Sequence, residues 1–281
     1  MTAFFRLPST IVTLVSLLVL LVLALPARAA DEARLEAFLE VTGFDVALES
    51  IRLSADSAPQ MLGMEARDFG SEWSRLVRDV FRTDVMHDMA IEILGNTLED
   101  DLLDHAADFY ATDLGQRLVA AENASHMEED EVLKTESGTA IVDGLVRLGA
   151  PRLELLKELN EASDVEGSSI RAIQEVQVRF LMAAASAGVI ELRMDEPDLR
   201  EALRAQEAEM LTTVKANALV SAAYTYQAFS DAEVAAYTEA LAHPSMQKVY
   251  ALMNAVQYEI MANRFERVAE RLAQMQPSQD L

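Results

Sequence analysis

The sequence predicts an all-α protein, a multi-helix bundle of about eight to ten helices. Its 281 residues include only 10 glycines and 7 prolines, and glycine is therefore at about half of its usual share of ~7%. Alternating Val, Ile and Thr runs bounded by Gly and Asn, which are typical of strands, are almost absent. Apolar residues instead recur at spacings of three and four, as on one face of a helix. Few tight turns and a helical period together indicate long helices.

The first 29 residues have the pattern of a signal peptide. Met1–Arg6 is a short basic segment, and Ile11–Leu25 is an uninterrupted run of apolar and small hydroxyl residues. That run has the length of about 7–15 residues expected for the hydrophobic part of a leader. Ala27-Arg28-Ala29 supplies the small residues that a signal peptidase reads. We therefore predict a signal peptide over residues 1–29, cleaved after Ala29.

The remainder of the chain is expected to be exported without a membrane anchor. No later segment approaches the ~18–20 consecutive apolar residues of a spanning helix. The chain also contains no cysteine, whereas secreted eukaryotic domains of this size usually carry disulfides. We predict a periplasmic or secreted protein, with the bacterial periplasm as the better fit.

Charge and composition exclude several classes of function. The formal net charge is −24, from 23 Lys and Arg against 47 Asp and Glu. Proteins that bind nucleic acid neutralise phosphates with clustered cations, so we expect no nucleic-acid partner. The absence of cysteine excludes thiolate metal sites and thiol nucleophiles.

The first half of the predicted body is read from residue 30 to residue 130. Gly95-Asn96-Thr97 is interpreted as a stop and a cap, followed by a helix with an apolar face from Leu98 to Phe109. A connecting helical segment follows over 131–162. Further helix breaks are predicted at Thr42-Gly43, Ala58-Pro59, Gly70-Ser71, Ser137-Gly138, Gly167-Ser168 and Glu196-Pro197.

The second half is read from residue 163 to residue 281. Ser230-Asp231-Ala232-Glu233 is a capping box and predicts a helix start. Pro244 suits the first turn of the next helix, where its missing N–H costs nothing. From Val249 to Met275 the apolar residues step by three and four, which predicts one long amphipathic helix.

The two halves show a weak internal repeat. Leu98–Val119 aligns with Phe229–Tyr250, and in both segments a capped helix is followed by a break and then by Gln, a cation and two apolar residues. Gln116 and Gln247 coincide in this alignment. We predict two related helical halves.

Two segments resemble a family of exported bacterial proteins, domain of unknown function 2059. Phe109–Arg117 is similar to its FY-x-T/S-P-x-G-Q-K/R signature, with Asp113 in place of the proline. Ala228–Glu233 with Tyr237 and Pro244 resembles a degenerate second copy, which has Met246 where the family has glycine. The resemblance implies a signal peptide, an all-helical body and no established activity.

The residues that carry this resemblance are assigned structural roles. They are Phe109, Tyr110, Gly115, Gln116, Ser230, Glu233, Tyr237 and Pro244. No catalytic, cofactor or metal residues are predicted, and we expect the chain to be no enzyme.

Other candidates for chemistry have a plainer explanation. Asp101, Asp104, His105 and Asp108 share one helical face and could converge on a metal, but an exposed acidic face is the favoured interpretation. The acidic run Glu128–Glu131 is interpreted as a helix start. The methionine pairs and Trp73 with its neighbouring phenylalanines are interpreted as core packing. These sets are Met61 with Met64, Met86 with Met89, and Trp73 with Phe69 and Phe81.

Two functions remain open from the sequence. The leading prediction is an interaction or scaffolding protein of the cell envelope, whose partner is an envelope protein. The alternative is a binding module for an apolar or amphiphilic small molecule held between the helical halves. Phe180–Val189 and Val214–Tyr226, which are rich in alanine, are the predicted lining of such a site. Homo-oligomer formation stays open in both cases.

Overall fold

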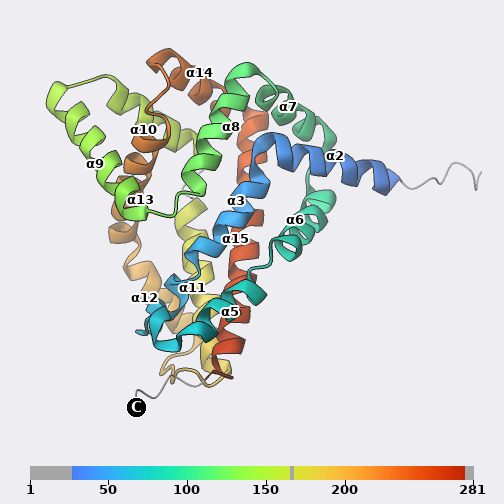
Figure 1. Ribbon diagram of the computed structural model, residues 1–281, viewed down its shortest axis with the longest axis vertical. Coiled ribbons are helices and arrows are strands. Elements are labelled where there is room, and N and C mark those ends of the chain that lie inside the picture. Colours follow the sequence, from blue (N-terminus) through green and yellow to red (C-terminus); the bar gives the residue numbers. More distant parts are fainter. Residues whose placement is uncertain (1–26, 165–167, 276–281) are drawn as a thin grey trace, which may run out of the picture.

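The computed structural model describes residues 27–164 and 168–275, and within these ranges the protein contains helices and no strand. The predicted all-α class is confirmed (Figure 1). The longer α-helices are α2 (Ala27–Thr42), α5 (Ser71–Val80), α6 (Thr83–Thr97), α7 (Asp100–Tyr110), α8 (Asp113–His126), α9 (Glu131–Leu148), α10 (Arg152–Ser163), α11 (Ser168–Ser186), α12 (Glu196–Ala205), α13 (Glu207–Thr225), α14 (Asp231–Ala242) and α15 (Pro244–Leu272). The short elements are α3 (Phe44–Ser50), η1 (Ile51–Ser54), α4 (Ser57–Met61) and η2 (Ala66–Phe69).

The prediction of eight to ten helices was wrong: the described ranges contain the twelve longer helices, and the segment between α2 and α5 adds short pieces. Gly43 ends α2 with φ = 71°, and Gly70 precedes α5 with φ = 55°. Such positive φ angles favour glycine, so the chain changes direction at both positions. A Cβ atom on Gly43 would also lie 2.8 Å from Val119 Cγ1 of α8. The predicted breaks at Thr42-Gly43 and Gly70-Ser71 are confirmed.

Other predicted breaks were wrong. α9 continues through Ser137-Gly138, because Gly138 is packed against α13, where a Cβ atom would lie 2.8 Å from Val220 Cγ1. The break predicted near Ala58-Pro59 lies just before Ser57, where α4 begins, and Pro59 falls in the first turn of that helix. Thr97 does not cap α7: its hydroxyl donates to the Ile93 carbonyl at 2.6 Å, and α7 begins after Glu99.

Several predicted helix starts are confirmed by their caps. Ser230 and Glu233 form the capping box of α14, and Pro244 opens α15. The acidic run before α9 ends in Asp130, whose carboxylate accepts from the Leu133 N–H at 2.9 Å. α12 begins at Glu196 behind Asp195, with Pro197 in its first turn. These ends satisfy N–H groups that have no partner within the helix.

α15 is the axis of the molecule. In Figure 1, α15 runs along most of the length of the molecule, with α11 beside it. It also packs against α5, α6 and α7. The predicted long helix is confirmed except at its end, since Met275 lies beyond Leu272. The residues that α15 buries are Met246, Val249, Val256, Ile260, Ala262, Phe265, Val268, Ala269 and Leu272.

A single hydrophobic core connects most of the described helices. It extends from Leu35 of α2 to Leu272 of α15, and Phe265 meets Phe81 and Phe180 edge to face at 6.1 and 5.8 Å. Helices of both predicted halves therefore share one core. Within the described ranges, no helix combines the length and apolar character needed to cross a bilayer.

Two predictions fall partly on residues outside the described ranges. Of the predicted signal peptide, residues 1–26 lie outside the described residues, and the predicted cleavage site after Ala29 falls in the first turn of α2. Gly167 of the predicted Gly167-Ser168 break also lies outside, while α11 begins at Ser168.

Candidate functional site

The most distinctive polar feature of the protein is a cluster of four tyrosines around one carboxylate. Tyr110 ends α7, Glu122 lies in α8, Tyr226 follows α13, Tyr237 lies in α14 and Tyr250 lies in α15. Tyr110 and Tyr237 expose 2% and 1% of their surface. We call these five residues the tyrosine–carboxylate cluster.

Hydrogen bonds connect all members of the cluster. Tyr226 and Tyr237 donate to Glu122 Oε1 at 2.7 and 2.8 Å. The Tyr237 hydroxyl also shares hydrogen bonds with those of Tyr250 at 2.7 Å and Tyr110 at 3.1 Å, and Tyr110 and Tyr250 are hydrogen-bonded to each other. Both donors thus reach the same carboxylate oxygen. Glu122 Oε2 accepts no hydrogen bond from any residue that the structure describes.

Burial determines the protonation behaviour of the cluster. Burial raises the pKa of Glu122 above its usual range, and the hydrogen bonds from Tyr226 and Tyr237 oppose that effect. Burial is also the first cause that raises the pKa of each of the four tyrosines, and nearby negative charge adds to it. The hydroxyls therefore remain protonated at neutral pH and stay available as donors.

The turn between α7 and α8 places Tyr110 and Glu122 in the cluster. The Thr112 hydroxyl accepts from the Gly115 N–H at 3.0 Å, and this cap starts α8. A Cβ atom on Gly115 would lie 2.6 Å from Tyr110 Cα and closer still to the Phe109 carbonyl oxygen. Only glycine fits this approach, so Gly115 sets the close contact between the two helices. Gln116 donates to the Ala111 carbonyl at 3.1 Å and fastens the same turn.

The turn between α14 and α15 is built in a related way. Gln247 donates to the Leu241 carbonyl at 2.6 Å, as Gln116 does at the end of α7. The starts of α7 and α14 are 131 residues apart, as are those of α8 and α15. His105 of α7 stacks on His243 between α14 and α15, with ring centroids 4.3 Å apart. The two helix pairs therefore lie against each other.

The eight motif positions all lie at or beside this junction. Phe109 stacks on Tyr237 at 5.8 Å between ring centroids and 3° between ring planes. Glu233 of the α14 capping box forms an ion pair with Arg117 of α8. This pair and the serine cap lower the pKa of Glu233 to about 2. The remaining positions are Tyr110, Gly115, Gln116, Ser230 and Pro244, which lie at the end of α7 and at the starts of α8, α14 and α15.

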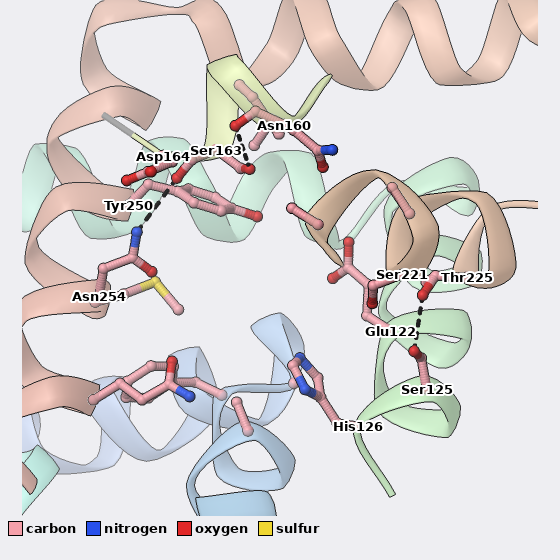
Figure 2. A pocket seen from close by; sticks show the side chains of 18 of the residues that line it. Glu122, Ser125, His126, Asn160, Ser163, Asp164, Ser221, Thr225, Tyr250 and Asn254 are labelled. Carbon is pink, nitrogen blue, oxygen red and sulfur yellow. Dashed lines mark hydrogen bonds between the residues drawn. The ribbon is translucent and has the colours of Figure 1, made fainter. Parts of the chain in front are cut away.

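A cavity of about 450 Å³ adjoins the cluster. Figure 2 shows Glu122 and Tyr250 at its wall, with Ser221 of α13 and Asn254 of α15. Although Glu122 lies deep in the protein, part of its side chain is accessible from the cavity. The volume is within the range of about 300–1,000 Å³ typical of small-molecule sites.

The cavity wall combines apolar surface with several polar side chains. Thr225 donates to the Ser125 hydroxyl at 2.8 Å, and Asn254 donates to the Ser163 carbonyl at 3.3 Å (Figure 2). His126 lies at the same wall, where burial and then the charge of Lys134 lower its pKa. Among the predicted lining segments, Val214–Tyr226 is part of the wall, whereas Phe180 of the other segment lies in the core.

The other candidates from the sequence do not form a site. Asp104 is paired with Arg34 at 2.7 Å, and His105 stacks on His243. No cluster of three or more acidic or histidine side chains suited to a metal occurs in the described part of the chain. Met86 is fully buried, and Trp73 is a core residue whose indole donates to Asp56 at 2.6 Å. Met61, Met64 and Met89 pack against the same core.

Glu122 was not predicted as a site residue. The available signal was its position on α8, one turn after Leu118 and three residues before Ser125, both of which are buried. A carboxylate on the buried face of a helix is costly unless a specific environment compensates it. Tyr226 and Tyr250 were missed because nothing in one sequence shows that distant tyrosines meet.

Within the described residues, the fold and this site define an all-helical protein with a cavity between its helices that a buried carboxylate adjoins. Residues 84–143 match the family described as "Uncharacterized protein conserved in bacteria (DUF2059)". The resemblance predicted from the sequence is thereby confirmed over α7, α8 and adjoining parts of α6 and α9, including Tyr110 and Glu122. The second copy of the motif lies outside the matched residues. Neither a curated protein nor a solved structure matches the chain.

Proposed function

We propose that the protein is a binding module that holds a small amphiphilic molecule in the cavity beside the tyrosine–carboxylate cluster. The observation that carries this proposal is the cavity of about 450 Å³ with a partly accessible, buried carboxylate at its wall. Burying an ionisable group that packing does not require lowers stability, so its presence at a cavity indicates a role in binding. The proposal assigns the site no reaction.

The position of the cavity supports this proposal. Its walls come from α8 of the first predicted half, α10 of the connecting segment, and α13, α14 and α15 of the second. The serine, threonine and asparagine groups in the wall provide donors and acceptors, while Phe44, Leu159 and Met261 provide apolar surface. This mixture suits a ligand with a polar end and an apolar end. Export to the periplasm, if the predicted leader is cleaved, would place the site among envelope solutes.

Native mass spectrometry tests the proposal. The full chain is expressed in a bacterial host with its leader, purified from the periplasm without chelator, and measured under native and denaturing conditions. We expect an excess mass of a few hundred daltons that disappears on denaturation. A bare chain mass in every preparation, with no stabilisation by any compound of an amphiphile panel, would contradict the proposal.

One observation favours the scaffolding alternative. α9 exposes Val132 by 67%, Leu133 by 51%, Val146 by 60% and Leu148 by 81%. Exposed apolar side chains of this kind occur at protein interfaces. If α9 binds an envelope protein, cross-linking in cells should capture the same partner repeatedly, and replacing Val146 and Leu148 by serine should abolish its capture.

A further inference from the structure

The unpaired oxygen of Glu122 indicates which kind of molecule the cavity holds. We propose that the ligand carries an organic ammonium group, and that this group binds against Glu122. The inference rests on the proposed function, since it identifies the chemical class of the ligand of the same cavity.

The first argument is the missing counter-charge. No described Arg, Lys or His forms an ion pair with Glu122, whose two hydrogen bonds come from neutral phenols. A buried carboxylate without a cation retains most of its desolvation penalty. Because both phenols donate to Oε1, Oε2 has room for a donor from the cavity. An ammonium group supplies a positive charge and an N–H or C–H surface at that position.

The second argument is the charge of the cavity wall. Lys134 is committed elsewhere: its ammonium donates to the Ser125 carbonyl at 2.9 Å and lies 3.7 Å from Glu131. Burial and the charge of Lys134 lower the pKa of His126, which favours its neutral form. Asp164 adds a second carboxylate to the wall, where it accepts from Ser169 at the start of α11. The wall thus contains the two carboxyl groups of Glu122 and Asp164 but only one ammonium group, that of Lys134. This excess of acidic groups disfavours an anionic ligand.

The third argument is the aromatic content of the wall. Five of the six tyrosines in the chain line the cavity. Tyr226, Tyr250 and Tyr258 are each partly accessible. Tyrosine rings attract cations through their π-electrons, and ammonium ligands are commonly held by such rings. Aromatic surface and one unpaired carboxylate together match an amine better than an alcohol or an acid.

Three probes of equal chain length test the inference: n-hexylamine, 1-hexanol and hexanoate. They are titrated at pH 7 into the wild-type chain, Glu122→Gln and Glu239→Gln, and Kd is measured by calorimetry. Glu239 is an exposed residue of α14 outside the cavity, so this variant matches the charge change without touching the site. Melting temperature and circular dichroism check that each variant folds.

We expect hexylamine to bind the wild-type chain and Glu239→Gln more tightly than hexanol or hexanoate. In Glu122→Gln its Kd should rise at least about tenfold, the size of one charge-assisted contact. Equal or reversed preference in the wild-type chain would overturn the inference, and that comparison needs no variant to fold. If hexanol or hexanoate binds best, the ammonium inference fails while the binding function stands. If none of the three binds, the inference also fails, and the native mass of the purified chain decides the proposed function separately.

Discussion

The Tyr237 hydroxyl lies 2.8 Å from Glu122 Oε1, and this hydrogen bond joins α14 to α8 across 115 residues of sequence. The same hydroxyl contacts those of Tyr110 and Tyr250. Tyr237 is therefore the centre of the network that closes one side of the cavity. Its removal affects a carboxylate and two phenols together, which makes it a sensitive point of the structure.

Tyr237→Phe should destabilise the protein. The ring and its stacking on Phe109 stay, but Glu122 loses one of two donors and two phenols lose a partner. We expect a loss of about 1–3 kcal/mol in the free energy of unfolding, measured by urea denaturation. Tyr224→Phe is the matched control, because the Tyr224 hydroxyl is not part of the network. Equal effects of the two variants would show that the network does not stabilise the fold.

Gly115→Ala should also destabilise the protein, because the added Cβ atom meets the backbone of Tyr110 and Phe109. We expect a cost of about 1–3 kcal/mol, typical of overpacking. Gly144→Ala is the opposite control: it lies within α9, and the nearest atom to its Cβ would be Arg147 Nη2 at 3.9 Å. Alanine there should stabilise the helix by about 0.5–1 kcal/mol. Melting curves that place both variants on the same side of wild type would contradict this account.

The pH dependence of stability should reveal the buried carboxyl of Glu122. Its native pKa is raised above the ordinary value of 4.5, so between the two values the native state binds more protons than the unfolded chain. Stability contributed by this group is therefore lost as pH rises through that interval.

The variant Glu122→Gln has no ionisable group at this position, so it does not lose stability by this route as the pH rises. The difference in free energy of unfolding, wild type minus variant, should fall as pH rises above 4.5, by about 1.4 kcal/mol for each unit of pKa shift. Parallel curves would contradict the raised pKa. The difference between the two proteins isolates Glu122, because both keep the other titratable groups around the site. These groups are Tyr110, Tyr226, Tyr237, Tyr250, His126, Lys134 and Asp164.

The α14 capping box offers a fourth stability test. Ser230→Ala removes the hydroxyl that accepts from the Glu233 N–H at 3.3 Å. We expect a cost of about 1 kcal/mol, the usual value for a serine cap, measured by thermal unfolding. Ser230→Asp should restore most of it, since aspartate caps equally well. Failure of the aspartate variant to recover stability would mean that the hydroxyl matters for a contact other than the cap.

Much of the fold could be predicted from the sequence, and the reasons are local. The capping box at Ser230 and the apolar period from Val249 to Leu272 depend on neighbours within a few residues, and α14 and α15 have the expected starts. Gly138 shows the limit. Its effect depends on Val220 of α13, so a glycine that suggested a break instead allows two helices to approach.

The candidate site was less predictable, because it is assembled from distant segments. Tyr110 and Tyr237 were singled out as motif positions, but nothing in their spacing shows that their hydroxyls meet Glu122. The cavity is lined by residues of α8, α13 and α15, and the relative placement of these helices depends on packing of the whole core. The segment Val214–Tyr226 was predicted as lining and is part of the wall, whereas Glu122, which interrupts the buried face of α8, was not singled out.

The central claim is that the cavity beside Glu122 is a ligand site, and filling it is the most direct test. Ser221→Leu places extra volume at the cavity wall, and its melting temperature verifies folding. Native mass spectra of the wild-type chain and this variant, purified in parallel, are then compared for non-covalent excess mass. We predict a bound molecule on the wild-type chain and a bare Ser221→Leu chain. An excess mass retained equally by both proteins, or absent from both, would contradict a ligand site in this cavity.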